Sequence, residues 1–354
     1  MEFGLTMSNP EPITSPDAWT GAEMRARRDW LVELSEREIA EIADATHAVI
    51  ARGLDIPDID SAAFPLPQLG PRVLALRDEV IWGRGFVQLR GLPVERWSMR
   101  EAATAYWGIG AHIGHAVTQN AGGHVLGHVR DMGLSADDPN VRVYQTTARQ
   151  NFHTDSCDIV ALLCLRPARK GGLSCIVSSA AIYNAMLAER PDLVAELTRQ
   201  VAIDRRGEAA ANGAGWWRAS VFNRDADHLI TIYTRRYIES AQRFADAPRL
   251  SPAYREALEL FDRLCDDPKL RLEIAFQPGD VQLLCNHTIL HDRTAYEDWP
   301  EPTRKRHLLR LWLCPPMGRK LPPEFATRYG SVEIGNRGGV ALPGTPRRAP
   351  LDPV

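Results

Sequence analysis

Apolar residues recur with the three- and four-residue spacing of amphipathic helices in several parts of the chain. This spacing predicts helical structure over 22–52, 71–81, 101–110, 180–187, 192–197 and 251–264. Two of these stretches contain a recognisable helix start. Ser35 with Glu38 has the form of a capping box, which predicts that a second helix begins inside 22–52. Ser251 and Pro252 supply a capping hydroxyl and a proline at the first helical position.

Short apolar runs bounded by glycine, proline and polar residues form the second pattern. They predict strands over 85–89, 141–144, 152–155, 159–165, 174–177, 270–276, 281–285 and 307–313. Strict alternation of strand and helix is absent, and the sequence contains no internal repeat. Many short strands with helices inserted between them favour a mainly β chain with helices (α+β), built on a closed β-sandwich or jelly-roll core.

Changes in composition along the sequence predict three regions. Residues 1–66 contain a Pro-, Ser- and Asn-rich leader over 1–20, followed by a helical extension. Residues 67–330 contain the strands of the core. Residues 331–354 form a tail rich in Gly, Pro and Arg, which we expect to be mobile.

The composition limits the class of protein. The 354 residues are 44% hydrophobic and 25% charged, which is typical of a soluble globular protein with a sizeable core. A formal charge of -3 without a basic cluster argues against a nucleic-acid partner or an anionic membrane surface. The first 15 residues lack the features of a secretory signal, and no apolar run reaches the length of a membrane helix. Six cysteines without a Cys-x-x-Cys pair are typical of buried thiols, so a cytoplasmic location is expected, and homo-oligomerisation is left open.

A histidine and an aspartate lie two positions apart in the predicted strand at 152–155. Side chains at positions i and i+2 share one face of a strand, so His153 and Asp155 would present an imidazole and a carboxylate side by side. Two imidazoles and one carboxylate form the metal site of non-haem Fe(II) oxygenases. Because the chain has ten histidines, the pair alone is equally compatible with a hydrogen-bonded surface pair.

Histidines further along the chain supply a third ligand. A tight turn at 278–280 leads into the strand at 281–285, which is followed by His287 and His291. Both could face inward, but the spacing from the turn favours His291 and leaves His287 a packing or supporting role. His124 and His128 are separated like helical ligands, yet the glycines around them argue against a helix, so we interpret both as structural.

Two arginines in the last predicted strand suggest an anionic ligand. Arg306, Leu308, Arg310 and Trp312 share one strand face. Burying two arginines among leucines is costly without an anionic partner, and a dicarboxylate would accept the bidentate fork of a guanidinium. A structural ion pair is the alternative. Ser174, after two glycines, could place a hydroxyl beside that carboxylate, although Gly-Gly-x-Ser is usually only a turn.

Jointly, these stretches resemble the taurine dioxygenase (TauD/TfdA) and clavaminate synthase-like group of Fe(II)/2-oxoglutarate-dependent oxygenases. The matching segments are Phe152-His-Thr-Asp-Ser156, Gly171-Gly-Leu-Ser174, Pro278-Gly-Asp280, Asn286-His-Thr-Ile-Leu-His-Asp-Arg293 and Arg306-His-Leu-Leu-Arg310. The resemblance extends from about Gly85 to Leu313 and implies a double-stranded β-helix fold. It is specific for the group and leaves the substrate open.

The resemblance implies a role for each matching residue. The implied iron ligands are His153, Asp155 and His291, because the group's His-x-Arg and Thr-Ala pattern falls on His291. Ser174 stands where the group has a Thr or Ser that contacts 2-oxoglutarate, and Arg306 matches the arginine that holds its distal carboxylate. Arg310 matches a second inward arginine, which would contact 2-oxoglutarate or the substrate. Related halogenases have Gly or Ala at the position of Asp155, so a carboxylate there implies hydroxylation or desaturation.

The expected protein is an Fe(II)- and 2-oxoglutarate-dependent dioxygenase that consumes O2, oxidises a small molecule and releases succinate and CO2. Asn151, Asn120, Tyr233 and Arg310 are candidates for substrate contact, although ordinary packing explains each equally well. If Arg310 is not used by 2-oxoglutarate, it favours an anionic substrate. The role of Asp292 stays undecided. The alternative is a jelly-roll metal- or ligand-binding protein without turnover. Signatures of a serine hydrolase or of a dinucleotide-binding strand–helix turn are absent from the sequence.

Overall fold

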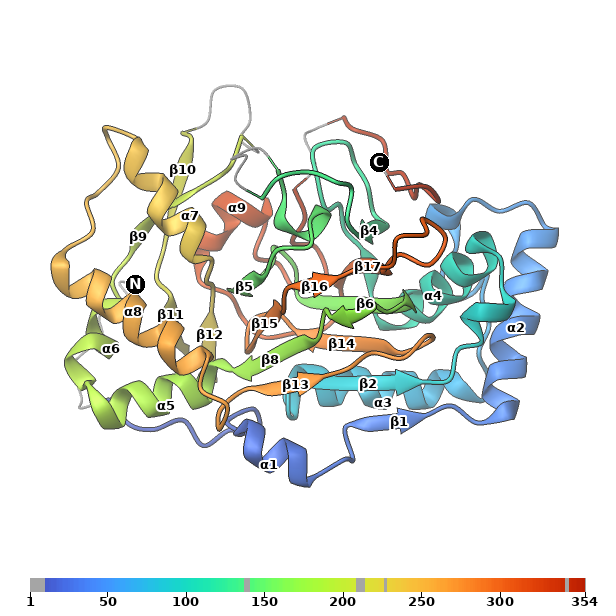
Figure 1. Cartoon of the computed structure of the whole chain (residues 1–354), viewed down its shortest axis with the longest axis horizontal. Helices are drawn as coiled ribbons and strands as arrows, with labels where there is room; N and C mark the ends of the chain where they lie inside the picture. Colours follow the sequence, from blue (N-terminus) through green and yellow to red (C-terminus); the bar gives the residue numbers. More distant parts are fainter. Residues whose placement is uncertain (1–9, 137–140, 208–213, 226–227, 341–343, 354) are drawn as a thin grey trace.

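Two β-sheets form the centre of the computed structural model, which describes residues 10–136, 141–207, 214–225, 228–340 and 344–353 (Figure 1). The larger sheet has the strand order β1-β2-β14-β6-β17-β3, with β4 paired to β17, and the smaller has the order β13-β8-β15-β5. Phe86 and Trp312 of the larger sheet share a buried cluster with Ile176 and Ile289 of the smaller one, so the sheets pack as a sandwich. The predicted mainly β, jelly-roll fold flanked by helices is confirmed.

The elements of the structure have the following bounds. The strands are β1 (Leu31–Glu33), β2 (Phe86–Arg90), β3 (His115–Ala116), β4 (Gly127–Val129), β5 (Gln150–His153), β6 (Ile159–Arg166), β7 (Lys170–Gly171), β8 (Ser174–Ser178), β9 (Val201–Asp204), β10 (Trp216–Ala219), β11 (Phe222–Asp225), β12 (His228–Thr231), β13 (Leu272–Ile274), β14 (Val281–Cys285), β15 (Ile289–Arg293), β16 (Tyr296–Glu297) and β17 (His307–Cys314). The α-helices are α1 (Gly21–Ala26), α2 (Glu36–Ala51), α3 (Leu69–Trp82), α4 (Met99–Ile113), α5 (Ser179–Glu189), α6 (Pro191–Leu197), α7 (Arg235–Ser240), α8 (Pro252–Cys265) and α9 (Ala326–Tyr329). None of the helices in the described ranges combines the length and the apolarity needed to cross a membrane.

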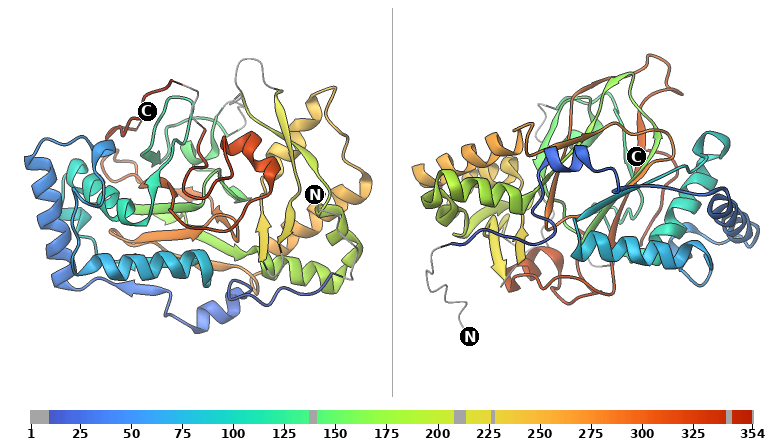
Figure 2. Two further views of the ribbon diagram at one scale, coloured as in Figure 1. Left: turned by 180° about the vertical axis from the view of Figure 1, so that it is seen from behind. Right: turned by 90° about the horizontal axis from the view of Figure 1, so that it is seen from below.

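Helices cover the sandwich at two opposite ends (Figures 1 and 2). At one end, α2, α3 and α4 pack with β2, β6, β14 and β17 in one large apolar cluster. At the other end, α5, α6 and α8 enclose a second cluster together with β9–β12. Strands β14 and β17 are buried along their whole length, which explains their nearly unbroken apolar composition.

The turn before β14 fixes where that strand lies. Gly279 has a φ of +84°, and a Cβ atom there would lie 1.9 Å from the carbonyl oxygen of Leu92, so only glycine fits. The adjacent Asp280 is buried and accepts hydrogen bonds from Gln88 (2.8 Å) and Arg90 (2.7 Å) on β2. This anchor holds β14 against β2 and sets the start of the segment that leads to β15.

The N-terminal helical stretch differs from the prediction. The sequence pattern predicts two helices within 22–52, with the second beginning near Ser35, whereas the structure has α1, the strand β1 and then α2. Leu31 pairs in parallel with Gln88 of β2, so the hydrogen bonds of the larger sheet outweigh the local helical pattern here. The capping box is confirmed, since Ser35 and Glu38 exchange both of its hydrogen bonds. The strand predicted over 141–144 is wrong, because Val143–Gln145 form a single 3-10 turn.

Parts of the leader and of the tail contact the core. Trp19 is buried, and Asp17 forms a buried ion pair with Arg319 (3.2 Å). In the tail, Arg337 donates to Asp158, at 2.6 Å for the shortest contact, and is itself buried. The loose leader over 1–20 and the mobile tail over 331–354 stay predictions, and residues 1–9, 341–343 and 354 lie outside the described part.

A chain of neutral histidines ties the tail to the larger sheet. Arg166 can only donate, so its Nη2 contact with Nδ1 of His307 (3.2 Å) makes that nitrogen an acceptor. Nε2 of His307 then donates to Nδ1 of His128 (2.7 Å), and Nε2 of His128 donates to the carbonyl oxygen of Pro350 (2.8 Å). Both histidines are structural, as predicted for His128.

These histidines predict a pH-dependent stability. Burial, followed by repulsion from His128, lowers the pKa of His307 to about 3. Burial also lowers the pKa of His128. The unfolded chain would take up both protons near pH 6.5, so this contribution to stability is complete above that pH and is lost below it. The loss is up to about 1.4 kcal/mol per pH unit for each histidine. Urea unfolding at pH 7.5 and pH 5 should show a larger loss in the wild type than in His307→Gln. Equal losses in the two proteins would contradict the assignment.

Candidate metal centre

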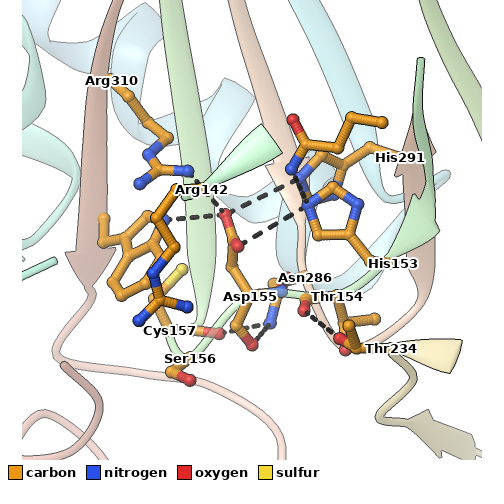
Figure 3. A network of polar contacts seen from close by, with 12 residues as sticks. Arg142, His153, Thr154, Asp155, Ser156, Cys157, Thr234, Asn286, His291 and Arg310 are labelled. Atoms are coloured by element: carbon orange, nitrogen blue, oxygen red, sulfur yellow. Dashed lines mark hydrogen bonds and ion pairs between the residues drawn. The ribbon is translucent and has the colours of Figure 1, made fainter. Parts of the chain in front are cut away.

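Three predicted ligands converge between the two sheets. His153, Asp155 and His291 each present one ligand atom, and these atoms all lie within 4.8 Å of one another. Nε2 of His153 lies 3.8 Å from Oδ1 of Asp155, and Nε2 of His291 lies 3.7 Å from Oδ2. Figure 3 shows both imidazoles on one side of the carboxylate. Two imidazoles and one carboxylate fit the donor set of a non-haem iron site.

Neighbouring strands bring the two histidines together. His153, at the end of β5, is paired with His291 of β15 in the smaller sheet. Asp155 lies just beyond β5, so the prediction that it shares a strand face with His153 is wrong in that detail. The side chain of Asn286 holds it instead: Oδ1 accepts from the Asp155 backbone N–H (2.6 Å), and Nδ2 donates to the carbonyl oxygens of Asp155 and Cys157 (2.8 and 2.9 Å).

The tautomer of His153 suits metal binding. Its Nδ1 lies 2.9 Å from the carbonyl oxygen of Asn151, which can only accept, so Nδ1 carries the proton. The lone pair of Nε2 is then directed at the metal centre. Nε2 of the Gln150 side chain lies 3.0 Å from this nitrogen and can donate to it. Burial, followed by repulsion from His291, lowers the pKa of His153 to about 4, which keeps the ring neutral near pH 7.

The carboxylate of Asp155 is surrounded by donors and cations. Burial by itself would raise its pKa, but Arg310 and His291 outweigh burial and hold the pKa well below the usual range. Nη1 of Arg310 lies 3.6 Å from Oδ2, and the indole N–H of Trp312 donates to the same oxygen at 2.8 Å. Gln119 accepts from Nε of Arg310 (2.7 Å) and donates to its carbonyl oxygen (2.8 Å). The guanidinium is therefore fixed beside the metal centre.

A narrow cavity extends from the ligands to a second group of cations. Its lining includes His153 and His291 at one end and Ser174, Arg293 and Arg306 elsewhere. Arg306 is 3% exposed, and its Nη1 has no hydrogen-bond partner in the described part of the chain. Arg293 donates to the carbonyl oxygens of Thr146 and Ala148, and its Nε is likewise unpartnered there. Two buried guanidinium groups facing a cavity fit an anionic cosubstrate with a distal carboxylate.

Ser174 lies in this cavity, as predicted, and its hydroxyl donates to Oε1 of Gln282 at 2.8 Å. Gln282, Asn286, Arg293 and Trp312 were given no role in the sequence analysis. A glutamine inside the otherwise apolar strand β14 is a signal that could have pointed to Gln282. A larger hollow of about 580 Å³ lies elsewhere, between Trp97, Leu165 and Trp299, and contains none of the predicted ligands.

His287, His124 and Asp292 have other partners. His287 lies against Asp158, with Nε2 3.3 Å from Oδ1, which agrees with the predicted preference for His291 as ligand. His124 contacts Asn120, away from the metal ligands. Asp292 is buried and accepts from Nε of Arg149 at 2.7 Å.

Three of the residues predicted to contact substrate do not line the cavity next to the metal ligands. Asn151 is exposed, and the pairing of β5 with β15 shifts register between Gln150 and His153. Asn120 uses its side-chain oxygen to accept from the backbone N–H groups of Gly122 and His124, which closes a local turn. Tyr233 is fully buried against Phe261, and its hydroxyl donates to Asp262 at 2.5 Å. Arg310 alone among the substrate candidates lines the cavity.

Comparison with known proteins decides the family. Residues 34–312 match the profile of the taurine catabolism dioxygenase TauD, TfdA family. The chain belongs to this family. This dioxygenase is 31% identical over 330 residues to FR-33289 synthase of Streptomyces rubellomurinus, covering 90% of this chain and 96% of that protein. It is 30% identical over 178 residues to a uridine-5'-phosphate dioxygenase of an Amycolatopsis species, covering 47% of this chain and 62% of that protein.

A solved structure with the same fold is an asparagine oxygenase in complex with Fe(II), hydroxyasparagine and succinate. Its TM-score is 0.61 at 15% identity, covering 80% of this chain and 93% of that one. Together with the family, these relatives identify the protein as a 2-oxoglutarate-dependent non-haem iron dioxygenase that oxidises a small molecule. The alternative of a binding protein without turnover is set aside.

The indole N–H of Trp312 is expected to strengthen iron binding at the metal centre. Trp312→Phe removes the N–H that donates to Asp155 but keeps an aromatic ring against Arg310. Loss of such an outer hydrogen bond typically weakens metal binding about 10- to 100-fold. Anaerobic Fe(II) titration measures the effect. The matched control is Trp216→Phe on β10. It removes an indole hydrogen bond to Asp246 and should leave iron affinity unchanged. Equal affinities of the Trp312→Phe protein and the wild type would contradict the role.

Proposed function

We propose that His153, Asp155 and His291 hold Fe(II) in this dioxygenase. The observation that carries the proposal is their convergence within 4.8 Å, with Nε2 of His153 unprotonated and Asp155 ionised. These are the protonation states that metal ligands need. Iron together with 2-oxoglutarate supplies the oxidising power, with release of succinate and CO2 as a substrate carbon is oxidised.

Arg306 and Ser174 are proposed to bind the far end of 2-oxoglutarate, with Arg293 as a further cation beside them. A dicarboxylate would give the unpartnered Nη1 of Arg306 the acceptor that it lacks among the described residues. Because Arg306 lies in a closed interior, water competes weakly for its hydrogen bonds, and a carboxylate gains more there than at the surface.

Arg310 stays a candidate for contact with 2-oxoglutarate or with the substrate. Its guanidinium is held between Tyr144 and Trp312, with each ring centroid 4.9 Å from Cζ. A cation fixed beside the metal ligands favours an anionic small molecule as substrate. The name of the uridine-5'-phosphate dioxygenase relative supports a phosphate-bearing one. Asp155, a carboxylate, favours hydroxylation or desaturation as the outcome.

The cellular location proposed for this enzyme is the cytoplasm. All six cysteines are buried and unpaired, as is usual in a reducing compartment.

Anaerobic addition of Fe(II) and 2-oxoglutarate to the protein tests the proposed centre. A visible charge-transfer absorption should develop with both present and should be absent with either one alone. In air, succinate should then form in proportion to added protein. Correctly folded protein that gives neither the absorption nor succinate would exclude the proposed iron and cosubstrate sites.

A further inference from the structure

The loop that carries Asp155 is held by two distant parts of the chain. It runs from Asp155 to Asp158, between β5 and β6. The first part is Asn286, whose side chain contacts the backbone of Asp155 and of Cys157 (Figure 3). The second is a stretch that starts in α9 and covers residues 328–339, which we call the C-terminal segment. None of the residues proposed to bind iron or 2-oxoglutarate belongs to this segment.

Hydrogen bonds tie the C-terminal segment to the start of the loop. The N–H of Gly339 donates to the carbonyl oxygen of Ser156 (2.8 Å), and the hydroxyl of Tyr329 donates to the carbonyl oxygen of Asp155 (3.3 Å). The close approach of the two backbones favours a glycine, because Gly338 has a φ of +90° and a Cβ atom there would lie 3.1 Å from the same oxygen of Ser156. Two successive carbonyl groups, beginning with that of Asp155 itself, therefore accept from this segment.

A buried ion pair ties the same segment to the end of the loop. Asp158 is 6% exposed and Arg337 is 3% exposed. Nη2 of Arg337 donates to Oδ1 of Asp158 at 2.6 Å, and Nε lies 3.0 and 3.1 Å from the two carboxylate oxygens. The guanidinium also donates to the carbonyl oxygens of Arg319 (2.8 Å) and Val332 (3.2 Å). An arginine held by this many partners fixes both the distance and the orientation of the carboxylate.

The two ends of the loop belong to one network. The carbonyl oxygen of Asp158 accepts from the backbone N–H of Asn286 (2.9 Å), whose side chain holds Asp155. Arg337 therefore connects, through Asp158 and Asn286, to the backbone that presents the Asp155 carboxylate. Because Asp155 lies beyond the end of β5, this network and not the regular pairing of the sheet sets the position of its backbone. A working metal site holds its ligands within about 0.5 Å of the productive geometry, so a shift of the loop would move the carboxylate out of place.

We propose that Arg337, acting through Asp158, positions Asp155 for iron binding. The inference rests on the proposed function, in which Asp155 is a ligand, and deepens it by adding a residue from the C-terminal segment. Arg337 lies outside the lining of the cavity next to the metal ligands, so it is a positioning residue. Groups that orient a metal ligand typically contribute about 10- to 100-fold to metal affinity. Arg337 should therefore affect the affinity for iron and leave the proposed site for 2-oxoglutarate as it is.

Anaerobic Fe(II) titration of Arg337→Gln tests the proposal. The variant should bind iron about 10-fold or more weakly than the wild type. Its affinity for 2-oxoglutarate at saturating iron should match that of the wild type, because Arg306 and Ser174 are untouched. Arg337→Lys keeps the charge but lacks the planar fork, so it should recover only part of the iron affinity.

Arg319→Gln is the matched control. Arg319 is also buried, forms an ion pair with the buried Asp17 (3.2 Å) and donates from Nε to the carbonyl oxygen of Ile81 (3.0 Å). These partners lie in the leader and in α3. Urea unfolding should show a loss of stability in Arg319→Gln and in Arg337→Gln, because each variant removes one partner of a buried ion pair. Only Arg337→Gln should lose iron affinity.

A double-mutant cycle tests whether Arg337 acts through Asp158. Asp158→Asn alone should weaken iron binding, and the double variant with Arg337→Gln should lose less than the sum of the two single effects, since both changes break the same contact. Should Arg337→Gln not fold, Arg337→Lys and Tyr329→Phe take its place. The second of these removes only the hydroxyl that donates to the Asp155 carbonyl oxygen. Each should bind iron more weakly than the wild type, and wild-type affinity in both would overturn the inference.

The outcomes separate this inference from the proposed function. A folded wild-type protein that binds no iron would overturn the metal centre itself. If the wild type binds iron but Arg337→Gln and Arg319→Gln have equal affinities, the positioning role is overturned and the metal centre stands. Additive losses in the double-mutant cycle would overturn the path through Asp158. A loss that is confined to the Arg337 and Asp158 variants and is not additive supports the inference.

Discussion

Asp155→Ala is expected to abolish both iron binding and succinate formation. The variant removes the one anionic ligand and leaves the Arg310 guanidinium and the Trp312 N–H facing two imidazoles. Loss of an outer partner alone costs about 10- to 100-fold in metal affinity, so loss of this ligand should exceed about 100-fold. Anaerobic Fe(II) titration and a succinate assay measure the two effects. An iron affinity within 10-fold of the wild type would show that Asp155 is not a ligand.

The two neighbouring histidines provide a matched pair for the same experiment. His291→Gln should lose iron as Asp155→Ala does. His287→Gln removes an equally buried imidazole four residues away, one that lies against Asp158. It should keep the iron affinity and lose only stability, by about 1–3 kcal/mol, because a buried polar contact is broken. Loss of iron in His287→Gln with retention in His291→Gln would reverse the assignment.

Arg306→Met is expected to raise the KM for 2-oxoglutarate about 30-fold or more, with a smaller effect on iron affinity. Truncating one partner of a buried, hydrogen-bonded charge pair typically costs about 2–5 kcal/mol. Arg306→Lys should rescue little, because an ammonium cannot reproduce the planar fork. Steady-state kinetics at varied 2-oxoglutarate concentration, with iron saturating, give the value.

Arg304→Met is the control for this prediction. Arg304 lies two residues away, its side chain is 52% exposed, and it stacks on Trp299 outside the cavity. A similar rise in KM for both variants would mean that the effect comes from the loss of one positive charge anywhere nearby, and not from the loss of a contact with the cosubstrate.

Much of this site could be predicted from the sequence because its proposed ligands lie in short, ordered motifs. His153 and Asp155 are separated by one residue, and His291 follows the turn at Gly279 by a spacing that one strand and one connection determine. Local patterns of this kind also predicted the capping box at Ser35 and the helix after Ser251, both of which the structure contains. In each case, neighbours in the sequence supply the interaction.

Contacts with the substrate were harder to predict from the sequence than the metal ligands, because such a contact depends on the direction in which a side chain points. Asn151 was expected to share a strand face with His153, but it is exposed, and the pairing of β5 with β15 is irregular between Gln150 and His153. Tyr233 was a candidate for substrate contact, yet its ring packs against Phe261 in the core.

The sequence by itself determined the class of chemistry: a two-histidine, one-carboxylate ligand set, an arginine for a dicarboxylate and a mainly β scaffold. Tertiary structure decided which histidine faces Asp155, how Asn286 holds that residue beyond its strand, and that Leu31–Glu33 form an edge strand where the local pattern is helical. The physical reason is the range of the interactions. Ligand spacing and helix caps depend on a few adjacent residues, whereas sheet pairing, burial and clusters of charge depend on contacts between residues far apart in the chain.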